Sequence, residues 1–174
     1  NDNGQWTDIT EQAGVGDESY SNGCACGDVD NDGDTDLYVT NFGDDILYIN
    51  NGNGTFTDQT AEMGINSPKW GSSAAFFDGD NDGWLDLYVT NYVEFSVDKN
   101  PWCGESISGL RAYCDPDVFE GITDDFYHNN GDGTFSNWAD KAGIANDHGK
   151  GLGVVLGDID NDGDMDIYVA NDKV

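Results

Sequence analysis

Residues 28–39 read Asp-Val-Asp-Asn-Asp-Gly-Asp-Thr-Asp-Leu-Tyr-Val, an acidic loop that runs directly into an apolar stretch. The loop pattern Asp-x-Asp-x-Asp-Gly-x-x-Asp occurs three times, at residues 28–36, 78–86 and 158–166. Carboxylates at loop positions 1, 3, 5 and 9 can surround one hard cation, and the position-7 carbonyl adds an oxygen after the tight turn at the position-6 glycine. Three agreeing copies favour a repeated calcium site over solvated turns.

The candidate ligands follow from these loop positions, and position 7 is included for its backbone oxygen. Magnesium prefers rigid octahedral sites that keep several waters, so four carboxylates and a carbonyl suit the larger calcium ion better. We therefore expect three calcium ions, bound by Asp28, Asp30, Asp32, Asp34 and Asp36 in the first loop, Asp78, Asp80, Asp82, Trp84 and Asp86 in the second, and Asp158, Asp160, Asp162, Asp164 and Asp166 in the third.

The loops differ from those of EF-hands and dockerins, which carry an acidic residue at position 12. Position 12 is Val39, Val89 or Val169 here. The segment after each loop, such as Leu-Tyr-Val-Thr-Asn at residues 37–41, is rich in β-branched and aromatic residues, which favours a strand. Each loop is therefore expected to join two β-strands.

A second element recurs out of phase with the acidic loop, at residues 4–15, 54–65 and 133–144. Two of its copies follow an Asn-Gly dipeptide, which is preferred in tight hairpin turns. One unit then contains four short strands, the number in a propeller blade. The expected fold class is all-β, with calcium-loop repeats forming β-propeller-type blades in a partial propeller or a propeller segment.

These landmarks divide one repeat domain into units. Residues 1–15 are expected to form a partial blade, 16–65 the first repeat, 66–144 the second repeat, and 145–174 a partial third repeat. The second repeat carries an insertion at about residues 93–123, because the second and third loops stand about 30 residues further apart than the first two. Half-units would expose strand edges, which predicts a longer parent propeller or head-to-tail assembly of chains into a filament.

Composition restricts the partners. The chain has 35 acidic and 6 basic residues, a formal net charge of −29, and therefore offers no basic patch to nucleic acid or an anionic membrane. A hydrophobic share of 37% is enough for a packed core, and no segment is long and apolar enough to be a membrane span. Calcium sites in extracellular modules have dissociation constants of about 10⁻⁴ to 10⁻³ M, so we expect a secreted or cell-surface protein.

The four cysteines fall into two pairs. Cys103 and Cys114 lie in the insertion, where a disulfide would stabilise a segment with little core of its own. Cys24 and Cys26 align with apolar residues of the other repeats, which favours small buried core residues on one strand face. A strained bridge between these two, or pairing with the insertion, remains open.

Catalysis has little support in the sequence. The two histidines, His128 and His148, stand near no nucleophile motif, and we interpret the acidic pairs 44–45 and 124–125 as solvated strand-start residues rather than as glycosidase carboxylates. A non-catalytic adhesion or assembly module is therefore expected, with a protein or glycan partner at a cell surface or in the matrix.

Carbohydrate binding is the alternative function. Exposed aromatic rings beside calcium loops can hold sugars, and the repeat pattern forces no apolar role on Trp70, Trp84 or Trp102. Trp84 occupies position 7 of the second loop, where its ring is expected to point outward. Trp6 aligns with Phe56 of the next repeat and is expected in the core.

The recurring motifs are Asp-x-Asp-Asn-Asp-Gly-x-x-Asp-Leu/Ile-Tyr-Val, Asn-Asn-Gly-x-Gly-Thr-Phe and Ala-Gly-Val/Ile. With them the chain resembles the FG-GAP/VCBS repeat family of calcium-bearing β-propellers, and within it the bacterial and animal proteins related to cartilage acidic protein. The resemblance implies one blade per repeat, calcium in each acidic loop, and a role in adhesion or protein contact. The Gly-Ala-Pro triplet of the family name is absent from the chain.

Overall fold

The computed structural model describes residues 4–105, 109–145 and 149–173. Most of its regular structure is β-strand, which confirms the all-β expectation. In chain order the elements are α1 (Thr10–Ala13), β1 (Ser21–Gly27), β2 (Asp36–Asp44), β3 (Ile46–Asn50), β4 (Phe56–Asp58), β5 (Pro68–Phe77), β6 (Asp86–Asn91), β7 (Gly104–Glu105), β8 (Leu110–Arg111), β9 (Asp125–Asn129), β10 (Phe135–Asn137), α2 (Ala139–Ala142), β11 (Gly151–Gly157) and β12 (Asp166–Asn171).

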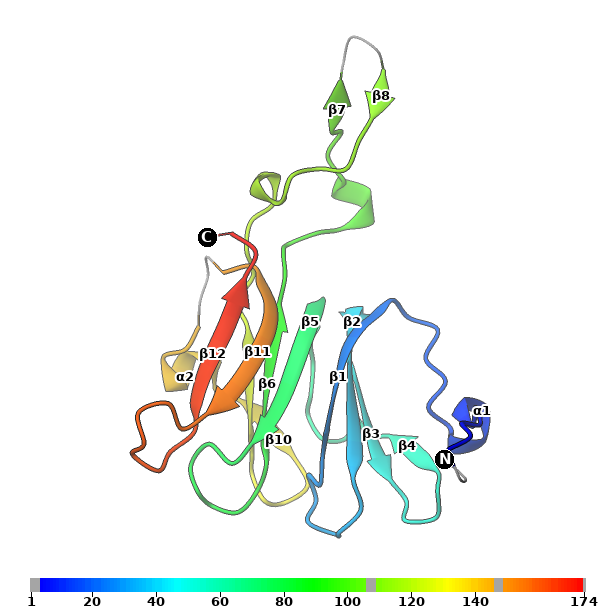
Figure 1. Cartoon of the computed structure of the whole chain (residues 1–174), viewed down its shortest axis with the longest axis vertical. Coiled ribbons are helices and arrows are strands. Elements are labelled where there is room, and N and C mark those ends of the chain that lie inside the picture. Colours follow the sequence, from blue (N-terminus) through cyan, green and yellow to red (C-terminus); the bar gives the residue numbers. More distant parts are fainter. Residues whose placement is uncertain (1–3, 106–108, 146–148, 174) are drawn as a thin grey trace.

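The strands form two four-stranded antiparallel units and a two-stranded third (Figure 1), and the end of β2 pairs with the start of β5 so that the first two units join in one eight-stranded sheet. The first blade is β1-β2-β3-β4, the second is β5-β6-β9-β10, and the third unit is β11-β12. The acidic loops join β1 to β2, β5 to β6 and β11 to β12, and the Asn-Gly turns join β3 to β4 and β9 to β10. The expectation of a partial β-propeller is thus confirmed.

The blades pack face to face through alternating strand residues. From the first blade, Tyr38 and Leu47 are cross-strand partners and fully buried. They meet Leu87, Val89 and Tyr127 of the second blade in one hydrophobic cluster. A second cluster repeats this arrangement one blade further on, where Tyr88 and Phe126 of the second blade meet residues 154–169 of the third unit. The second blade therefore packs against the first blade with one face and against the third unit with the other.

This arrangement overturns the expectation that Cys24 and Cys26 are buried. Both thiols are free and exposed, and no bridge joins them to each other or to the insertion. They lie on the face of the first blade that corresponds to the covered Ala74 and Phe76 of the second, but no blade within the described residues packs against it. Trp6 is also not in the core, because its side chain is 85% exposed.

The innermost strands of the three units, β1, β5 and β11, lie side by side. Their close approach depends on small residues: a Cβ on Gly23 would stand 2.8 Å from the Ser72 carbonyl oxygen. Hydrogen bonds cross between these strands at equivalent repeat positions, from Asn22 Nδ2 to Gly71 O (2.9 Å) and from Ser72 Oγ to Gly151 O (2.7 Å). The blades are thereby held at a fixed separation along the inner edge.

The insertion leaves the blades at the end opposite the acidic loops (Figure 1). It contains the short hairpin of β7 and β8 and the 3-10 turns Val97–Lys99 and Pro116–Val118. The predicted Cys103–Cys114 disulfide closes the base of this hairpin, with a Cα–Cα distance of 5.2 Å.

Candidate calcium-binding loops

Each acidic loop is folded by its own first carboxylate. The side chains of Asp28, Asp78 and Asp158 accept hydrogen bonds from the backbone N–H groups of loop positions 5 and 6, at 3.0–3.2 Å in all three loops. Position 4 is asparagine in every copy, with a left-handed backbone conformation (φ 58° to 60°) that asparagine tolerates better than most residues. The asparagine at position 4 therefore meets a requirement of the loop backbone, while the aspartates around it supply candidate ligands.

Carboxylate oxygens converge in all three loops. In the first two loops, one oxygen each from positions 1, 3 and 5 lies within 4.8 Å of the others, and in the third loop the group is formed by positions 1, 3 and 9. Such groups fit a hard cation with oxygen ligands. The members are Asp28, Asp30 and Asp32, then Asp78, Asp80 and Asp82, then Asp158, Asp160 and Asp166.

The position-9 aspartates tie the loop to the blade. Asp36 accepts the Val29 N–H (2.9 Å) and, across the strand, the Asn50 N–H (2.8 Å). Asp86 accepts the corresponding N–H groups of residues 79 and 129 at 3.2 and 2.8 Å. Burial raises the pKa of both Asp36 and Asp86, which the backbone donors only partly counteract. A carboxylate oxygen has two lone pairs, so these bonds leave room for a metal.

Position 7 turns its side chain away from the loop interior. A Cβ on Gly52 would meet the Asp34 carboxylate at 2.7 Å, and one on Gly131 would meet the Trp84 indole at 3.0 Å. The side chains of Asp34 and Trp84 thus lie against the Asn-Gly turns of their own blades, whereas Asp164 accepts a hydrogen bond from Asn81 of the second loop. The Trp84 ring is half-buried against its turn and does not project into solvent as expected. Five of the predicted ligands lie outside the converging groups of side chains: Asp34, Asp36, Trp84, Asp162 and Asp164.

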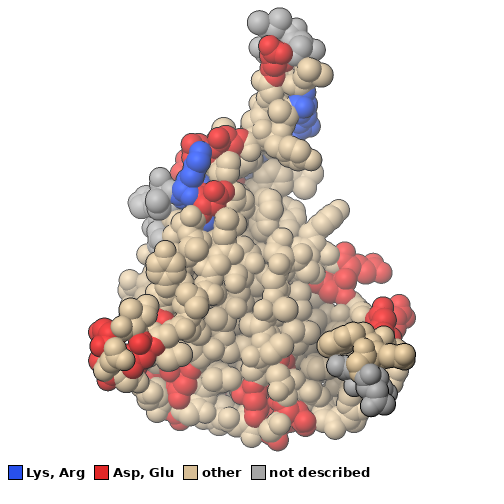
Figure 2. Space-filling view, viewed as in Figure 1, with Lys and Arg blue, Asp and Glu red and all other residues tan. Residues whose placement is uncertain are grey.

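Hydrogen bonds connect neighbouring loops. Asn31 Nδ2 donates to the Gly83 carbonyl of the second loop (3.1 Å), and Asn81 Nδ2 donates to Asp164 Oδ1 of the third (2.8 Å). Figure 2 shows Asp and Glu side chains around the lower end of the molecule, where the loops lie, and further acidic side chains beside the Lys and Arg near the upper end. The three loops therefore form one connected acidic rim.

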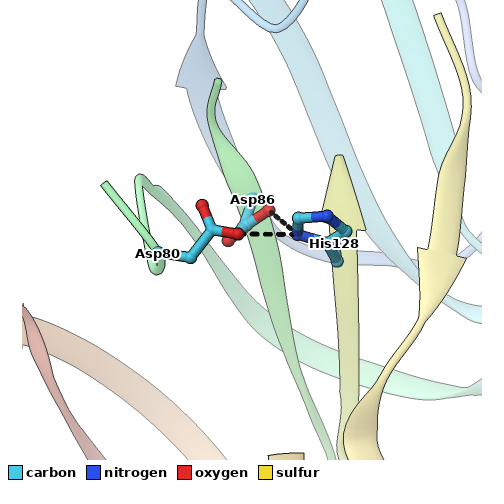
Figure 3. A group of neighbouring side chains, drawn as sticks. All are labelled: Asp80, Asp86 and His128. Atoms are coloured by element: carbon cyan, nitrogen blue, oxygen red, sulfur yellow. Dashed lines mark ion pairs between the residues drawn. The ribbon is translucent and has the colours of Figure 1, made fainter. Parts of the chain in front are cut away.

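The second loop contains a group that sequence reasoning missed. His128, on β9, points its ring toward Asp80 and Asp86 (Figure 3). Its Nδ1 atom lies 3.2 Å from Asp86 Oδ1 and 3.7 Å from Asp80 Oδ2. The only sequence signal is that His128 replaces the apolar Ile49 of the first blade, and that difference carried no functional reading by itself.

Of the acidic pairs 44–45 and 124–125, Asp44 is exposed as the sequence indicated, but the other three residues are buried. Asp45 is 2% exposed and accepts hydrogen bonds from the Tyr38 hydroxyl and the Asn41 N–H, at 2.8 and 2.7 Å. Asp124 does the same for Tyr88 and the residue-91 N–H. Burial raises the pKa of Asp45 to about 7 and raises that of Asp124 as well. These carboxylates link the β2 and β6 strands to the strands that follow them.

The comparisons with known proteins match the same repeats. A family model for FG-GAP-like repeats matches residues 28–89 and 114–169. Cartilage acidic protein 1 of human is 37% identical over 71 residues, which cover 39% of this chain and 11% of the relative. The mouse protein of the same name is 35% identical over 71 residues, with the same two shares. The chain therefore aligns with about a tenth of the length of these relatives. Of the helices in the described part of the chain, none has the length and apolar character needed to cross a membrane.

Proposed function

The chain belongs to the FG-GAP-like repeat family, and on that basis we propose that it is a calcium-stabilised, non-catalytic propeller module that serves adhesion or assembly outside the cell. The observation that carries this proposal is the convergence of carboxylates in three equivalent loops on one rim. Bound calcium would neutralise the repulsion among these groups, which are crowded within 4.8 Å. Loops of this kind fill at extracellular calcium concentrations.

The environment of the other acids supports a non-catalytic role. Asp45, Asp124 and Asp125 are buried, and each accepts hydrogen bonds from side chains or backbone that hold strands together. Asp125 is also paired with Lys69 Nζ at 2.8 Å. Carboxylates that are buried and hydrogen-bonded in this way stabilise the packing of the strands and are not placed to exchange a proton with a substrate.

Assembly is supported by two uncovered blade faces. The exposed thiols of Cys24 and Cys26 mark one face, on the first blade. Val155 and Tyr168, a cross-strand pair on the third unit, mark the other and are 59% and 60% exposed. In the second blade the corresponding Tyr88 is buried against the next unit. We propose that further blades cover both faces, supplied by a longer parent chain or by a second copy.

Calcium dependence is the test of the proposed function. Ligand binding to the folded state stabilises it by about 2.7 kcal/mol per site at a hundredfold excess over Kd, so millimolar calcium should raise the melting temperature of chelator-stripped protein markedly. Magnesium at the same concentration is the control and should have a smaller effect. Equal melting temperatures in excess EGTA and in calcium would contradict the proposal.

Carbohydrate binding remains the second candidate because of one cleft beneath the insertion. Its volume is about 800 Å³, and its lining includes Trp70, Tyr92, Phe95, Arg111 and Tyr113. Aromatic rings beside a guanidinium are a surface on which sugars stack and hydrogen-bond. This cleft contains Trp70 but neither Trp84 nor Trp102.

A glycan array with wild-type protein and Tyr113→Ala tests this candidate. Tyr113 is fully exposed, so its truncation should leave the fold intact and remove only ring contacts. Binding that is lost in the variant would favour the carbohydrate function. A blank array, or unchanged binding, would argue against the cleft.

A further inference from the structure

We propose that the second acidic loop and His128 together form a mixed nitrogen and oxygen site for a divalent first-row transition metal ion, with Zn²⁺ as the representative. The ligands are His128 Nδ1, Asp80 and Asp86, which come from β9, the loop and the start of β6 (Figure 3). Imidazole suits zinc and its neighbours, whereas calcium prefers oxygen ligands alone.

The distances suit a small ion. Two ligands at 2.0–2.1 Å from a tetrahedral zinc ion are about 3.4 Å apart. His128 Nδ1 lies 3.2 Å from Asp86 Oδ1 and 3.7 Å from Asp80 Oδ2, and all three ligand atoms lie within 4.8 Å of one another. The imidazole nitrogen therefore already stands close to a tetrahedral ligand spacing from each of the two carboxylates.

The imidazole is buried and lacks a partner for its inward-facing nitrogen. His128 is 9% exposed, and Nδ1 makes no hydrogen bond despite its approach to the two carboxylates. The ring is stacked on Trp138 with centroids 3.7 Å apart and an interplanar angle of 19°. Lys141 Nζ lies 3.0 Å from the centroid of the same indole. A ligand atom that is buried, unpaired and fixed in direction is what a metal site requires.

The carboxylate partner is fixed as well. Asp86 accepts backbone hydrogen bonds on both oxygens, from Asn129 N–H to Oδ1 and from Gly79 N–H to Oδ2. Hydrogen bonds of this kind orient ligating carboxylates in metal sites. The first blade supplies an internal reference: Asp36 is held in the same way, but Ile49 occupies the position of His128. The nitrogen ligand is thus specific to the second loop.

The inference stands apart from the calcium proposal. Asp80 belongs both to the oxygen group with Asp78 and Asp82 and to the group with His128. The two ions therefore compete for this loop, while the first loop offers only oxygen ligands. Zinc binding through His128 does not depend on whether calcium stabilises the fold.

The experiment is equilibrium dialysis of the whole, chelator-stripped chain against Zn²⁺ alone, with metal counted by elemental analysis. Wild-type protein should take up about one zinc ion per chain at the tight site. His128→Ile, which installs the residue of the first blade, should bind zinc at least about tenfold more weakly. His148→Gln, which removes the other histidine of the chain, is the matched control and should bind as the wild type does.

A spectroscopic measurement keeps the proposal testable if His128→Ile fails to fold. In ¹⁵N-histidine-labelled His148→Gln protein, the remaining imidazole reports on His128 alone, and zinc should shift its Nδ1 resonance. Zinc uptake that is equal in wild type and His128→Ile would overturn the proposal. So would an imidazole that stays doubly protonated beside Asp86 when zinc is added, since that identifies an ion pair only. Calcium-dependent melting is read separately, so failure of either proposal is distinguishable from failure of the other.

Discussion

Single residues set the geometry of each acidic loop. The position-1 carboxylates bind backbone N–H groups of their own loops, and the position-4 asparagines adopt a left-handed conformation while reaching the next loop. The same aspartates therefore shape the loop and supply the converging oxygens of the proposed calcium site. This explains why the motif could be read from the sequence, because backbone and ligand requirements fall on the same positions.

Asp80 and Asn81 should have different effects on calcium binding, although they are adjacent. Asp80 belongs to the converging group of the second loop, whereas Asn81 contributes only a hydrogen bond to Asp164. In calorimetric titrations, Asp80→Ala should reduce the number of calcium ions bound by about one. Asn81→Ala should keep the number, because it removes the link between loops and strains the left-handed backbone at this position but takes away no carboxylate. Equal losses in the two variants would contradict this assignment.

Asp45 should make stability fall as pH rises from about 4 to 7. Burial raises the pKa of Asp45 to about 7, so between these values the folded state holds a proton that the unfolded chain has released. The penalty is absent at low pH and complete above 7, and linkage sets it at roughly 4 kcal/mol. Denaturant unfolding across this range should show a flatter pH profile for Asp45→Asn, and parallel profiles would show that Asp45 is not the group responsible.

At the scale of elements, the features that could be predicted from the sequence are those that depend on local residue patterns. The strands around the acidic loops, the Asn-Gly turns and the Cys103–Cys114 bridge all follow from composition and short spacing. Burial depended on which blade covers which face, and that is a property of three-dimensional neighbours. Cys24 has the periodicity of a core residue, but no blade in the described part of the chain packs against its face. Asp45 has the sequence context of a solvated residue, but it is buried and accepts a hydrogen bond from the Tyr38 hydroxyl.

The inner strands offer a matched test of blade spacing. Gly23 in β1 and Gly153 in β11 occupy the same repeat position, but a Cβ on Gly23 would stand 2.8 Å from the Ser72 carbonyl, whereas a Cβ on Gly153 meets nothing within 4 Å. Gly23→Ala should lower the free energy of unfolding by about 1–3 kcal/mol, since backbone atoms must move. Gly153→Ala should leave chemical denaturation almost unchanged. Similar losses in both variants would attribute the effect to strand propensity rather than to spacing.

At the scale of the whole molecule, the acidic loops and the insertion lie at opposite ends (Figure 1). The acidic rim is built from repeated positions, whereas the cleft beneath the hairpin comes from the one segment that the other units lack. The inserted end can therefore vary without changing the residues of the acidic loops. His128 is the exception, because it changes the chemistry of the rim from within a strand.

The uncovered faces should make the chain associate in millimolar calcium. The open face of the first blade corresponds to the face with which the second blade packs on the first. The face of the third unit that carries Val155 and Tyr168 corresponds to the opposite side of the same type of contact. This blade-to-blade contact already occurs twice within the molecule. Sedimentation velocity should therefore show concentration-dependent growth, because a heterologous contact of this kind propagates from chain to chain. The double variant Val155→Lys with Tyr168→Lys places charge on one half and should remain monomeric. Leu110→Lys, equally exposed but on the hairpin, should behave as the wild type. A wild-type chain that stays monomeric at every concentration, or a double variant that still associates, would show that these faces are not the interface.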